Sequence, residues 1–258
     1  MFIPGLCAIS FRKNAIDEIA SHASAAGLSV IEWGSDVSVP SGDSGSAISA
    51  RALADSRGLR SPSYGSYFKL GLHNTADLIP LIENAKILGS SILRIWGHNT
   101  LLTPEDKSKW DMLVREAKAA ADLAAQHGIT LALECHNNTV TAHYENALRF
   151  LADVDSENLR MYWQPNHLLS YEYNIASIRA LAPYVEVIHA FNWDKAGRYP
   201  LAEGKETWLE YLAEFSEEAS RRDIPVLLEF MPDGEITSLG REASTLINML
   251  EESSRRTT

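Results

Sequence analysis

The chain has 258 residues, of which 45% are hydrophobic and 22% are charged, and its formal net charge is −11. A chain of this size and composition can bury a large core and fits one soluble domain. The acidic charge disfavours nucleic acid as a partner, and no apolar run reaches the roughly 18 residues that a membrane span needs.

Short apolar runs alternate with amphipathic segments along the whole chain. The apolar runs predict strands at residues 6–11, 30–34, 59–68, 91–97, 130–134, 159–165, 185–193 and 224–231. The segments between them predict helices at residues 15–26, 47–57, 75–88, 103–127, 143–154, 175–181, 207–221 and 238–251, before a frayed polar tail at 253–258. Eight strand–helix units in this length predict parallel strands closed into a single (β/α)8 TIM barrel that spans residues 1–258.

Polar side chains gather where the predicted strands end. They are Glu32, Arg94 or His98, Glu134, His136, Gln164, His167, His189 and Glu229. In a (β/α)8 barrel the active site lies at this end of the strands. Glu134, Gln164, His189 and Glu229 belong to four consecutive strands, which lie about 4.8 Å apart in a sheet, so their side chains can converge on one point.

These four side chains form a mixed nitrogen and oxygen set of possible metal ligands. Such a set suits hard or borderline divalent cations better than thiolate-selected metals. Crowded carboxylates repel each other, and a cation between them relieves that repulsion. We therefore expect a divalent metal cofactor, with Mn²⁺ as the first choice and Mg²⁺, Co²⁺ or Zn²⁺ as alternatives.

Four segments of the chain resemble the xylose-isomerase-like superfamily of sugar isomerases and epimerases. They are Leu131–His136, Tyr162–His167, Val187–Asp194 and Val226–Glu229. The resemblance implies that a divalent metal is held by Glu134, Gln164, His189 and Glu229. The family usually has Asp where this chain has Gln164. An amide oxygen can still ligate a hard cation, but it brings no negative charge, so metal affinity is expected to be lower or metal choice shifted.

The same resemblance implies proton transfer at a carbon next to a sugar carbonyl, through an enediolate that the metal stabilises. Glu134 and Glu229 would form the acid/base pair on opposite sides of the substrate. The candidate substrate contacts are then His136, His167, Arg198 and Trp96. We favour an unphosphorylated sugar, because no cluster of lysine and arginine stands at a strand end in the sequence.

Three other functions stay open at this stage. A lyase acting on a keto-sugar or glycoside would use the same first proton abstraction. A hydrolase like the abasic-site endonucleases would need further histidines, and the segment Tyr64–Tyr67 offers none. A metal-free sugar-binding protein is suggested by Gln164. Residues 1–5 lack the features of a signal peptide, so we expect a cytoplasmic protein; the sequence leaves a homo-oligomer open.

Overall fold

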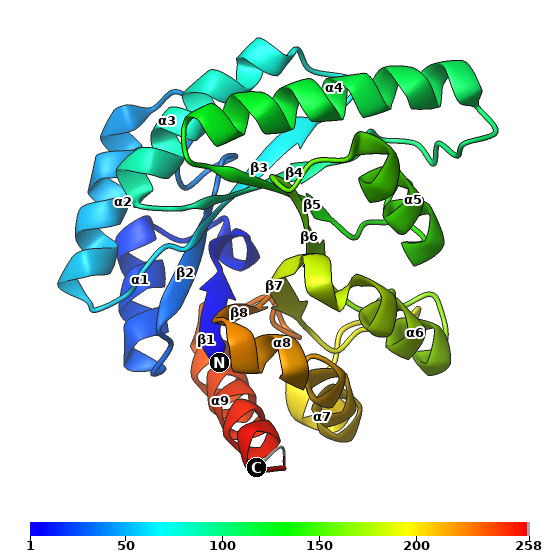
Figure 1. The fold of residues 1–258 in the computed structure, drawn as a ribbon. Helices are drawn as coiled ribbons and strands as arrows, with labels where there is room; N and C mark the ends of the chain where they lie inside the picture. Colours follow the sequence, from blue (N-terminus) through cyan, green and yellow to red (C-terminus); the bar gives the residue numbers. More distant parts are fainter. Residues whose placement is uncertain (257–258) are drawn as a thin grey trace.

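The computed structural model describes residues 1–256, which form a closed barrel of parallel strands surrounded by helices (Figure 1). The strands follow one another around the barrel in chain order, and β1 closes the barrel by pairing with β8. Their bounds are Phe2–Cys7 (β1), Val30–Gly34 (β2), Ser63–Lys69 (β3), Ile92–Trp96 (β4), Thr130–Glu134 (β5), Leu159–Trp163 (β6), Val185–Ala190 (β7) and Ile224–Leu228 (β8). The predicted (β/α)8 TIM barrel is confirmed.

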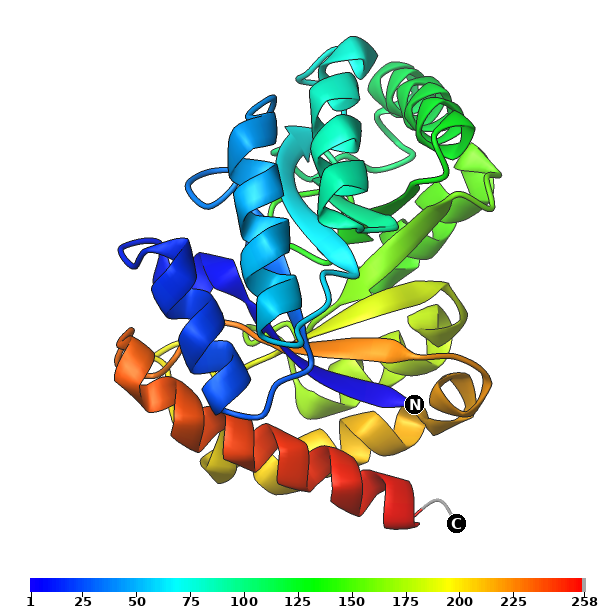
Figure 2. The same ribbon diagram turned by 90° about the vertical axis from the view of Figure 1, so that its left-hand side faces the viewer.

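The helices lie outside the strands and cover them (Figure 2). The α-helices are Ile16–Ala25 (α1), Ser44–Ser56 (α2), Leu78–Leu88 (α3), Lys107–Gln126 (α4), Tyr144–Val154 (α5), Tyr171–Leu181 (α6), Lys205–Glu214 (α7), Ser216–Arg221 (α8) and Leu239–Arg256 (α9). Short 3-10 helices are Ala8–Phe11 (η1), Thr75–Asp77 (η2), Ala182–Tyr184 (η3), Leu201–Gly204 (η4) and Ile236–Ser238 (η5). Within residues 1–256, none of the helices has the length and apolarity that crossing a membrane requires.

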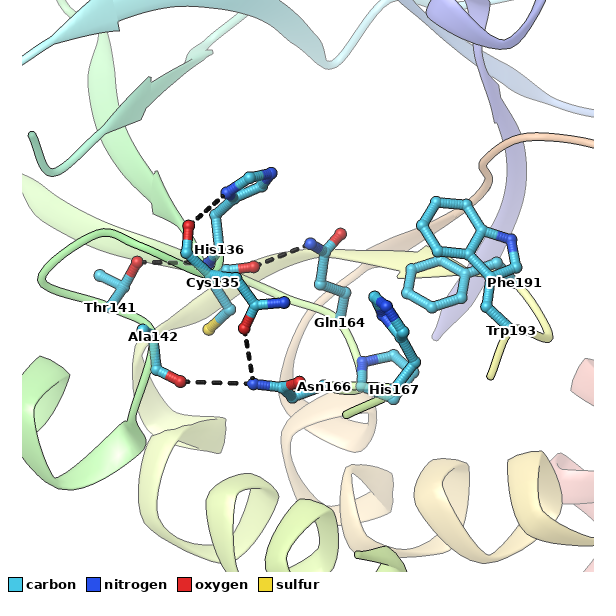
Figure 3. Close-up of a pocket in the computed structure, with 11 residues that line it drawn as sticks. Cys135, His136, Thr141, Ala142, Gln164, Asn166, His167, Phe191 and Trp193 are labelled. Atoms are coloured by element: carbon cyan, nitrogen blue, oxygen red, sulfur yellow. Dashed lines mark hydrogen bonds between the residues drawn. The ribbon is translucent and has the colours of Figure 1, made fainter. Parts of the chain in front are cut away.

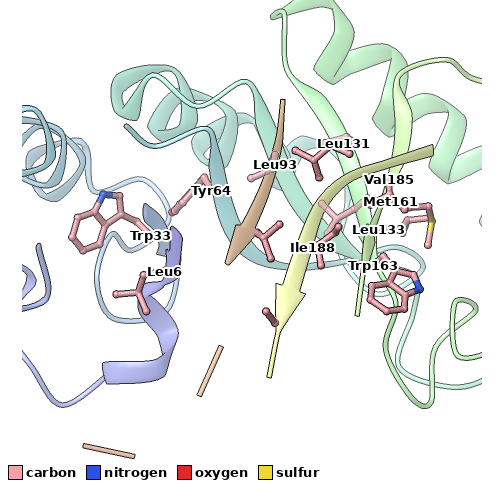
Figure 4. Packing of buried hydrophobic residues seen from close by; sticks show 14 of the residues in the cluster. Leu6, Trp33, Tyr64, Leu93, Leu131, Leu133, Met161, Trp163, Val185 and Ile188 are labelled. Carbon is pink, nitrogen blue, oxygen red and sulfur yellow. The ribbon is translucent and has the colours of Figure 1, made fainter. Parts of the chain in front are cut away.

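The core has two apolar layers because successive side chains of a strand point to opposite faces. The larger layer lies between the strands and the helices and includes Leu131, Leu133 and Ile188 (Figure 4). The smaller layer comprises Cys7, Ile9, Val30, Ile92, Ala132, Tyr162, Val187 and Leu227. Ala132 belongs to the smaller layer, whereas its neighbours Leu131 and Leu133 belong to the larger one. In β5 the side chain of Ala132 therefore points into the barrel, and those of its neighbours point toward the helices.

Both ends of the described chain lie at the end of the barrel where the strands begin (Figures 1 and 2). The N-terminal ammonium of Met1 donates hydrogen bonds to the carbonyl oxygens of Ala219, at 2.5 Å, and Arg222, at 2.8 Å. Helix α9 ends on the same side. The loops that follow the strands form the opposite end of the barrel.

Strand β1 begins four residues before the predicted start at residue 6. Pro4 has no N–H to donate, but its carbonyl accepts a hydrogen bond from the Ser29 N–H at 2.9 Å, so it still pairs with the neighbouring strand. A Cβ on Gly5 would lie 2.4 Å from Val30 Cγ2 and 2.5 Å from Leu227 Cδ2, so only glycine allows this close approach. The run predicted to complete the strand forms η1 instead.

Several helix bounds also differ from the prediction: α2 and α6 begin three and four residues earlier than expected, and the helix predicted over residues 207–221 is divided into α7 and α8. Helix α4 begins at Lys107 rather than 103, because the Asp106 N–H donates to the Thr103 carbonyl at 3.0 Å and closes a separate turn first. Helix α9 continues to Arg256, so the tail expected to fray from residue 253 is helical over most of its length. Ion pairs one turn apart, such as Arg255 with Glu251 at 3.3 Å, stabilise that last turn. Residues 257–258 lie outside the described residues.

Candidate active site and metal centre

The alternation of side chains along each strand brings the four predicted ligands to the barrel interior. Each lies two residues after a side chain of the smaller core layer, and therefore on the same face. The pairs are Ala132 with Glu134, Tyr162 with Gln164, Val187 with His189, and Leu227 with Glu229. Glu134, His189 and Glu229 are buried, with exposed fractions of 3%, 0% and 5%. Buried ionisable groups need compensating partners, and these three have one another.

Three oxygen atoms from three strand ends surround one nitrogen of His189. Its Nδ1 lies 3.2 Å from Gln164 Oε1, 3.5 Å from Glu229 Oε2 and 3.7 Å from Glu134 Oε1. Ligand atoms bound about 2.1 Å from one cation lie about 3.0–3.4 Å apart in tetrahedral or octahedral geometry. These three distances are close to those values, but within residues 1–256 Glu134, His189 and Glu229 do not form a group whose ligand atoms all lie within 4.8 Å of one another. The donors converge on His189 Nδ1 and would have to move closer together to hold a single divalent cation.

The amide of Gln164 is oriented for metal ligation. Its Nε2 donates a hydrogen bond to the carbonyl oxygen of Cys135 at 2.8 Å (Figure 3). Because the nitrogen is engaged there, the oxygen of the same amide is the atom that faces His189. Gln164 therefore presents the group that a hard cation prefers, although without the charge of an aspartate.

A second set of possible ligands overlaps with this one. Within residues 1–256, Cys7, His189 and Glu229 have ligand atoms that all lie within 4.8 Å of one another, and Glu134 is not part of that group. Burial and the nearby charge of Glu32 raise the pKa of the Cys7 thiol well above its usual value, which keeps it protonated. Hard divalent cations prefer oxygen to thiol ligands, so we favour the oxygen set, in which the Glu134 or Glu229 carboxylate would have to move to complete the coordination.

Glu134 and Glu229 sit in different electrostatic surroundings. Burial raises the pKa of Glu134, but the Arg94 guanidinium and His189 outweigh it and lower the pKa to about 2. Burial raises the pKa of Glu229, and the charge of Glu134 adds to that effect although His189 opposes it. Paired carboxylates whose environments separate their pKa values are typical of acid/base sites.

Sequence reasoning placed Glu32 and Arg94 at strand ends but gave them no role. The Glu32 carboxylate accepts hydrogen bonds from Tyr162 Oη at 2.6 Å, Ser63 Oγ at 2.7 Å and Cys7 Sγ at 3.4 Å. Arg94 lies between Glu32 and Glu134, with Nη1 3.6 Å from Glu32 Oε1 and Nε 3.4 Å from Glu134 Oε2. Glu32 and Arg94 are each a charged residue inside an otherwise apolar strand, and this sequence feature could have indicated that the two side chains pair inside the barrel.

The predicted substrate contacts fall into two places. Trp96 donates from Nε1 to Glu134 Oε2 at 2.6 Å, and the His136 ring stacks on the Trp96 ring with centroids 4.3 Å apart. His136 and His167 line a cavity of about 80 Å³ beside Gln164 (Figure 3). Arg198 does not line this cavity; its guanidinium lies over the rings of Trp193, at 5.0 Å, and Phe230, at 4.5 Å.

The sequence profile of the family described as the xylose isomerase-like TIM barrel matches residues 20–198. The chain belongs to this family. The match covers β2 to β7 and includes Glu134, Gln164 and His189. No curated protein that was compared with the chain matches it.

Several solved structures share the fold of this chain. One is the probable 3-DHS dehydratase AsbF of Bacillus anthracis, with 20% identity, a TM-score of 0.76, and coverage of 96% of this chain and 99% of that one. The D-psicose 3-epimerase of Clostridium cellulolyticum H10 has 15% identity, a TM-score of 0.72 and coverage of 98% of both chains. A xylose isomerase-like protein of Mycobacterium smegmatis, solved with magnesium, has 16% identity, a TM-score of 0.73 and coverage of 97% of both. At these identities the likeness is one of fold.

Proposed function

We propose that this protein is a divalent-metal-dependent isomerase or epimerase that moves a proton at the carbon next to a sugar carbonyl. The observation that carries the proposal is the set of oxygens from Glu134, Gln164 and Glu229 around Nδ1 of His189. Membership of the family supports a small sugar as substrate. The magnesium found with one protein of the same fold supports a divalent cation; we keep Mn²⁺ as the first choice, with Mg²⁺, Co²⁺ or Zn²⁺ as alternatives.

A cation held by these four groups would polarise the sugar carbonyl and so acidify the neighbouring C–H. The proton itself would be moved by the two carboxylates. Trp96 holds the Glu134 carboxylate through a hydrogen bond. Within residues 1–256 the Glu229 carboxylate accepts no side-chain hydrogen bond, and its ion-pair partner is the His189 imidazole at 3.5 Å. Glu229 is therefore the freer group and the better candidate to remove the first proton, and Glu134 the group that returns it.

The remaining predicted contacts would orient the sugar. His136 and His167 offer ring nitrogens beside Gln164, at hydrogen-bonding range of a substrate that enters the adjoining cavity. Trp96 would act mainly through Glu134. Its ring also lies under Lys69, whose Nζ is 4.8 Å from the ring centroid, and beside His136. Other side chains therefore already contact the ring, and a substrate wall is a lesser role for it.

The test starts with metal analysis of protein purified without chelator or affinity metal. Wild type is compared with Glu134→Gln, Glu229→Gln and the control Glu83→Gln, an exposed carboxylate on α3. We expect about one divalent ion per chain in wild type and in the control, and loss of it in the two site variants. Wild-type protein that takes up no metal, even after dialysis against Mn²⁺, would contradict the proposal and favour a metal-free sugar-binding protein.

Proton exchange in D₂O then tests the reaction. Keto- and aldo-sugars incubated with the metal-loaded protein should gain deuterium next to the carbonyl, and the product should be an epimer or an aldose–ketose isomer. A lyase is the second candidate, because it begins with the same abstraction and a probable dehydratase shares the fold. It would release water or another leaving group, which mass spectrometry detects. Cleavage of abasic-site DNA would point to the hydrolase alternative.

A further inference from the structure

A second and larger cavity lies beside the candidate active site. Its volume is about 430 Å³, against about 80 Å³ for the cavity next to Gln164. It is formed by the loops that follow β1, β7 and β8. The lining residues that matter here are Ser10, Arg12, Lys13, Arg198, Phe230 and Glu235.

The cavity carries more positive than negative charge, although the whole chain is acidic. Arg12, Lys13 and Arg198 line it against the single carboxylate of Glu235. Within residues 1–256, Lys13 and Arg198 have no carboxylate partner. Arg12 is held by Asp36, with Nε 2.5 Å from Oδ2, and by the Tyr67 hydroxyl at 2.6 Å, which leaves part of its guanidinium unused.

Aromatic rings hold Arg198 in place without using its hydrogen-bond donors. The guanidinium carbon lies 4.5 Å from the centroid of Phe230 and 5.0 Å from that of Trp193. Stacking on an aromatic face fixes the plane of a guanidinium while its N–H groups remain available. A fixed guanidinium with free donors is suited to bidentate binding of a carboxylate or phosphate.

The backbone joins this cavity to the candidate acid/base pair. Phe230 directly follows Glu229 and has a φ of 53°, in the left-handed region that bulky residues avoid. Its N–H donates to Ser10 Oγ at 2.8 Å, and Ser10 Oγ donates to the Cys7 carbonyl at 2.8 Å. Trp193, 5.5 Å from Phe230 by ring centroids, also borders the cavity beside Gln164 in Figure 3. The aromatic pair therefore stands between the two cavities.

We infer that this cavity binds an anionic group of the substrate, a phosphate monoester or a carboxylate carried by the sugar. The inference rests on the proposed function, and it replaces the neutral sugar that the sequence favoured. The lysine–arginine cluster that the sequence did not contain forms only on folding, when the loop after β1 meets the loop after β7. Loops after the seventh and eighth strands are also where (β/α)8 barrels frequently bind phosphate.

Binding of inorganic phosphate and of D-glucuronate, measured by titration calorimetry, tests the anion site without any turnover. The variants are Arg198→Gln and Lys13→Gln, and the matched control is Lys195→Gln, an exposed lysine of the same β7–α7 loop that does not line the cavity. We expect roughly tenfold or greater loss of affinity in the first two, as for one charge-assisted hydrogen bond, and no change in the control. Equal affinity in all four proteins, or no binding by wild type, would overturn the inference.

Proton exchange with matched substrates distinguishes the source of the charge and separates the two hypotheses. A ketopentose, its 5-phosphate and a hexuronate are compared. Exchange confined to the phosphate or the hexuronate, and weakened in Arg198→Gln, supports the inference and identifies the anion. Exchange that is as fast with the neutral ketopentose overturns the inference and leaves the proposed function standing. Phosphate binding that Arg198→Gln weakens, without exchange on any sugar, supports the anion site and contradicts the proposed function.

Discussion

The indole of Trp96 and the carboxylate of Glu134 are joined by a hydrogen bond of 2.6 Å from Nε1 to Oε2. The bond leaves Oε1 of the same carboxylate as the atom nearest to His189, 3.7 Å from its Nδ1. Trp96 thereby sets which oxygen of Glu134 faces the candidate metal centre. Groups that orient a metal ligand in this way typically change metal affinity or activity by about 10–100-fold when they are removed.

Trp96→Phe should weaken metal binding or lower kcat/KM by about 10–100-fold, because it removes this hydrogen bond but keeps an aromatic ring against His136. The matched control is Trp110→Phe. The Trp110 Nε1 also donates to a carboxylate, Asp153 Oδ2 at 2.8 Å, but between α4 and α5. Calorimetry with Mn²⁺ and proton-exchange rates are the measurements. Equal effects of the two substitutions would mean that Trp96 stabilises the fold and does not orient Glu134.

Gln164→Asp should tighten binding of a divalent cation, because it adds a negative charge to the proposed ligand set. Gln164→Leu, which removes the oxygen, should weaken it. The expected difference between the two variants is about tenfold or more in the dissociation constant of Mn²⁺, measured by calorimetry. If both variants bind Mn²⁺ as wild type does, Gln164 is not a ligand, and the orientation of its amide serves only to hold the loop after β5.

The barrel and the convergence of four strand ends were predictable because both depend on local patterns. A short apolar run that ends in polar residues, as in Leu131–Leu133 followed by Glu134 and His136, predicts the strand and its carboxyl end. The two-residue alternation then places Glu134 on the face of Ala132, inside the barrel. The same alternation applies to His189 and Glu229, so no tertiary information was needed to bring them together.

Interactions that depend on the register between distant strands could not be predicted in this way. Glu32 meets the Tyr162 hydroxyl across the barrel, 130 positions along the chain. The charge of Arg94 on β4 is neutralised by Glu134 of the adjacent strand β5 and by Glu32 of β2, which does not pair with β4. The basic cavity is a further case, because Arg198 joins Arg12 only when β8 pairs with β1 and closes the barrel.

Arg94→Met should destabilise the protein by about 3–5 kcal/mol, because it leaves the buried carboxylates of Glu32 and Glu134 without their cation. The side chain of Arg94 is only 2% exposed, so solvent does not compensate for the loss. Arg149→Met is the control. Its ion pair with Asp153 is on the surface, with the arginine 62% exposed, and should contribute less than about 1 kcal/mol. Urea unfolding gives both values.

The double variant Arg94→Met with Glu32→Gln tests whether the two side chains interact. Removing one of the two carboxylates should restore part of the stability lost in Arg94→Met, because less uncompensated charge then remains buried. If Glu32→Gln lowers the free energy of unfolding by the same amount in Arg94→Met as in wild type, the two side chains do not interact. The Tyr162 and Ser63 hydrogen bonds to Glu32 would then be what holds that carboxylate in place.

Gly65→Ala should destabilise the protein by about 1–3 kcal/mol, because the added methyl group would overpack the buried pair of Glu32 and Arg94. A Cβ at this position would lie 2.7 Å from Glu32 Oε1 and 3.1 Å from Arg94 Nη2. Glu32 is unable to move aside easily, because Tyr162 and Ser63 both hold its other oxygen. The control is Gly240→Ala in α9, where a Cβ would meet nothing within 4 Å and the better helix propensity of alanine should raise stability by up to about 1 kcal/mol. Thermal unfolding of the two variants should therefore shift in opposite directions, and a Gly65→Ala protein as stable as wild type would contradict the close packing of Glu32 against β3.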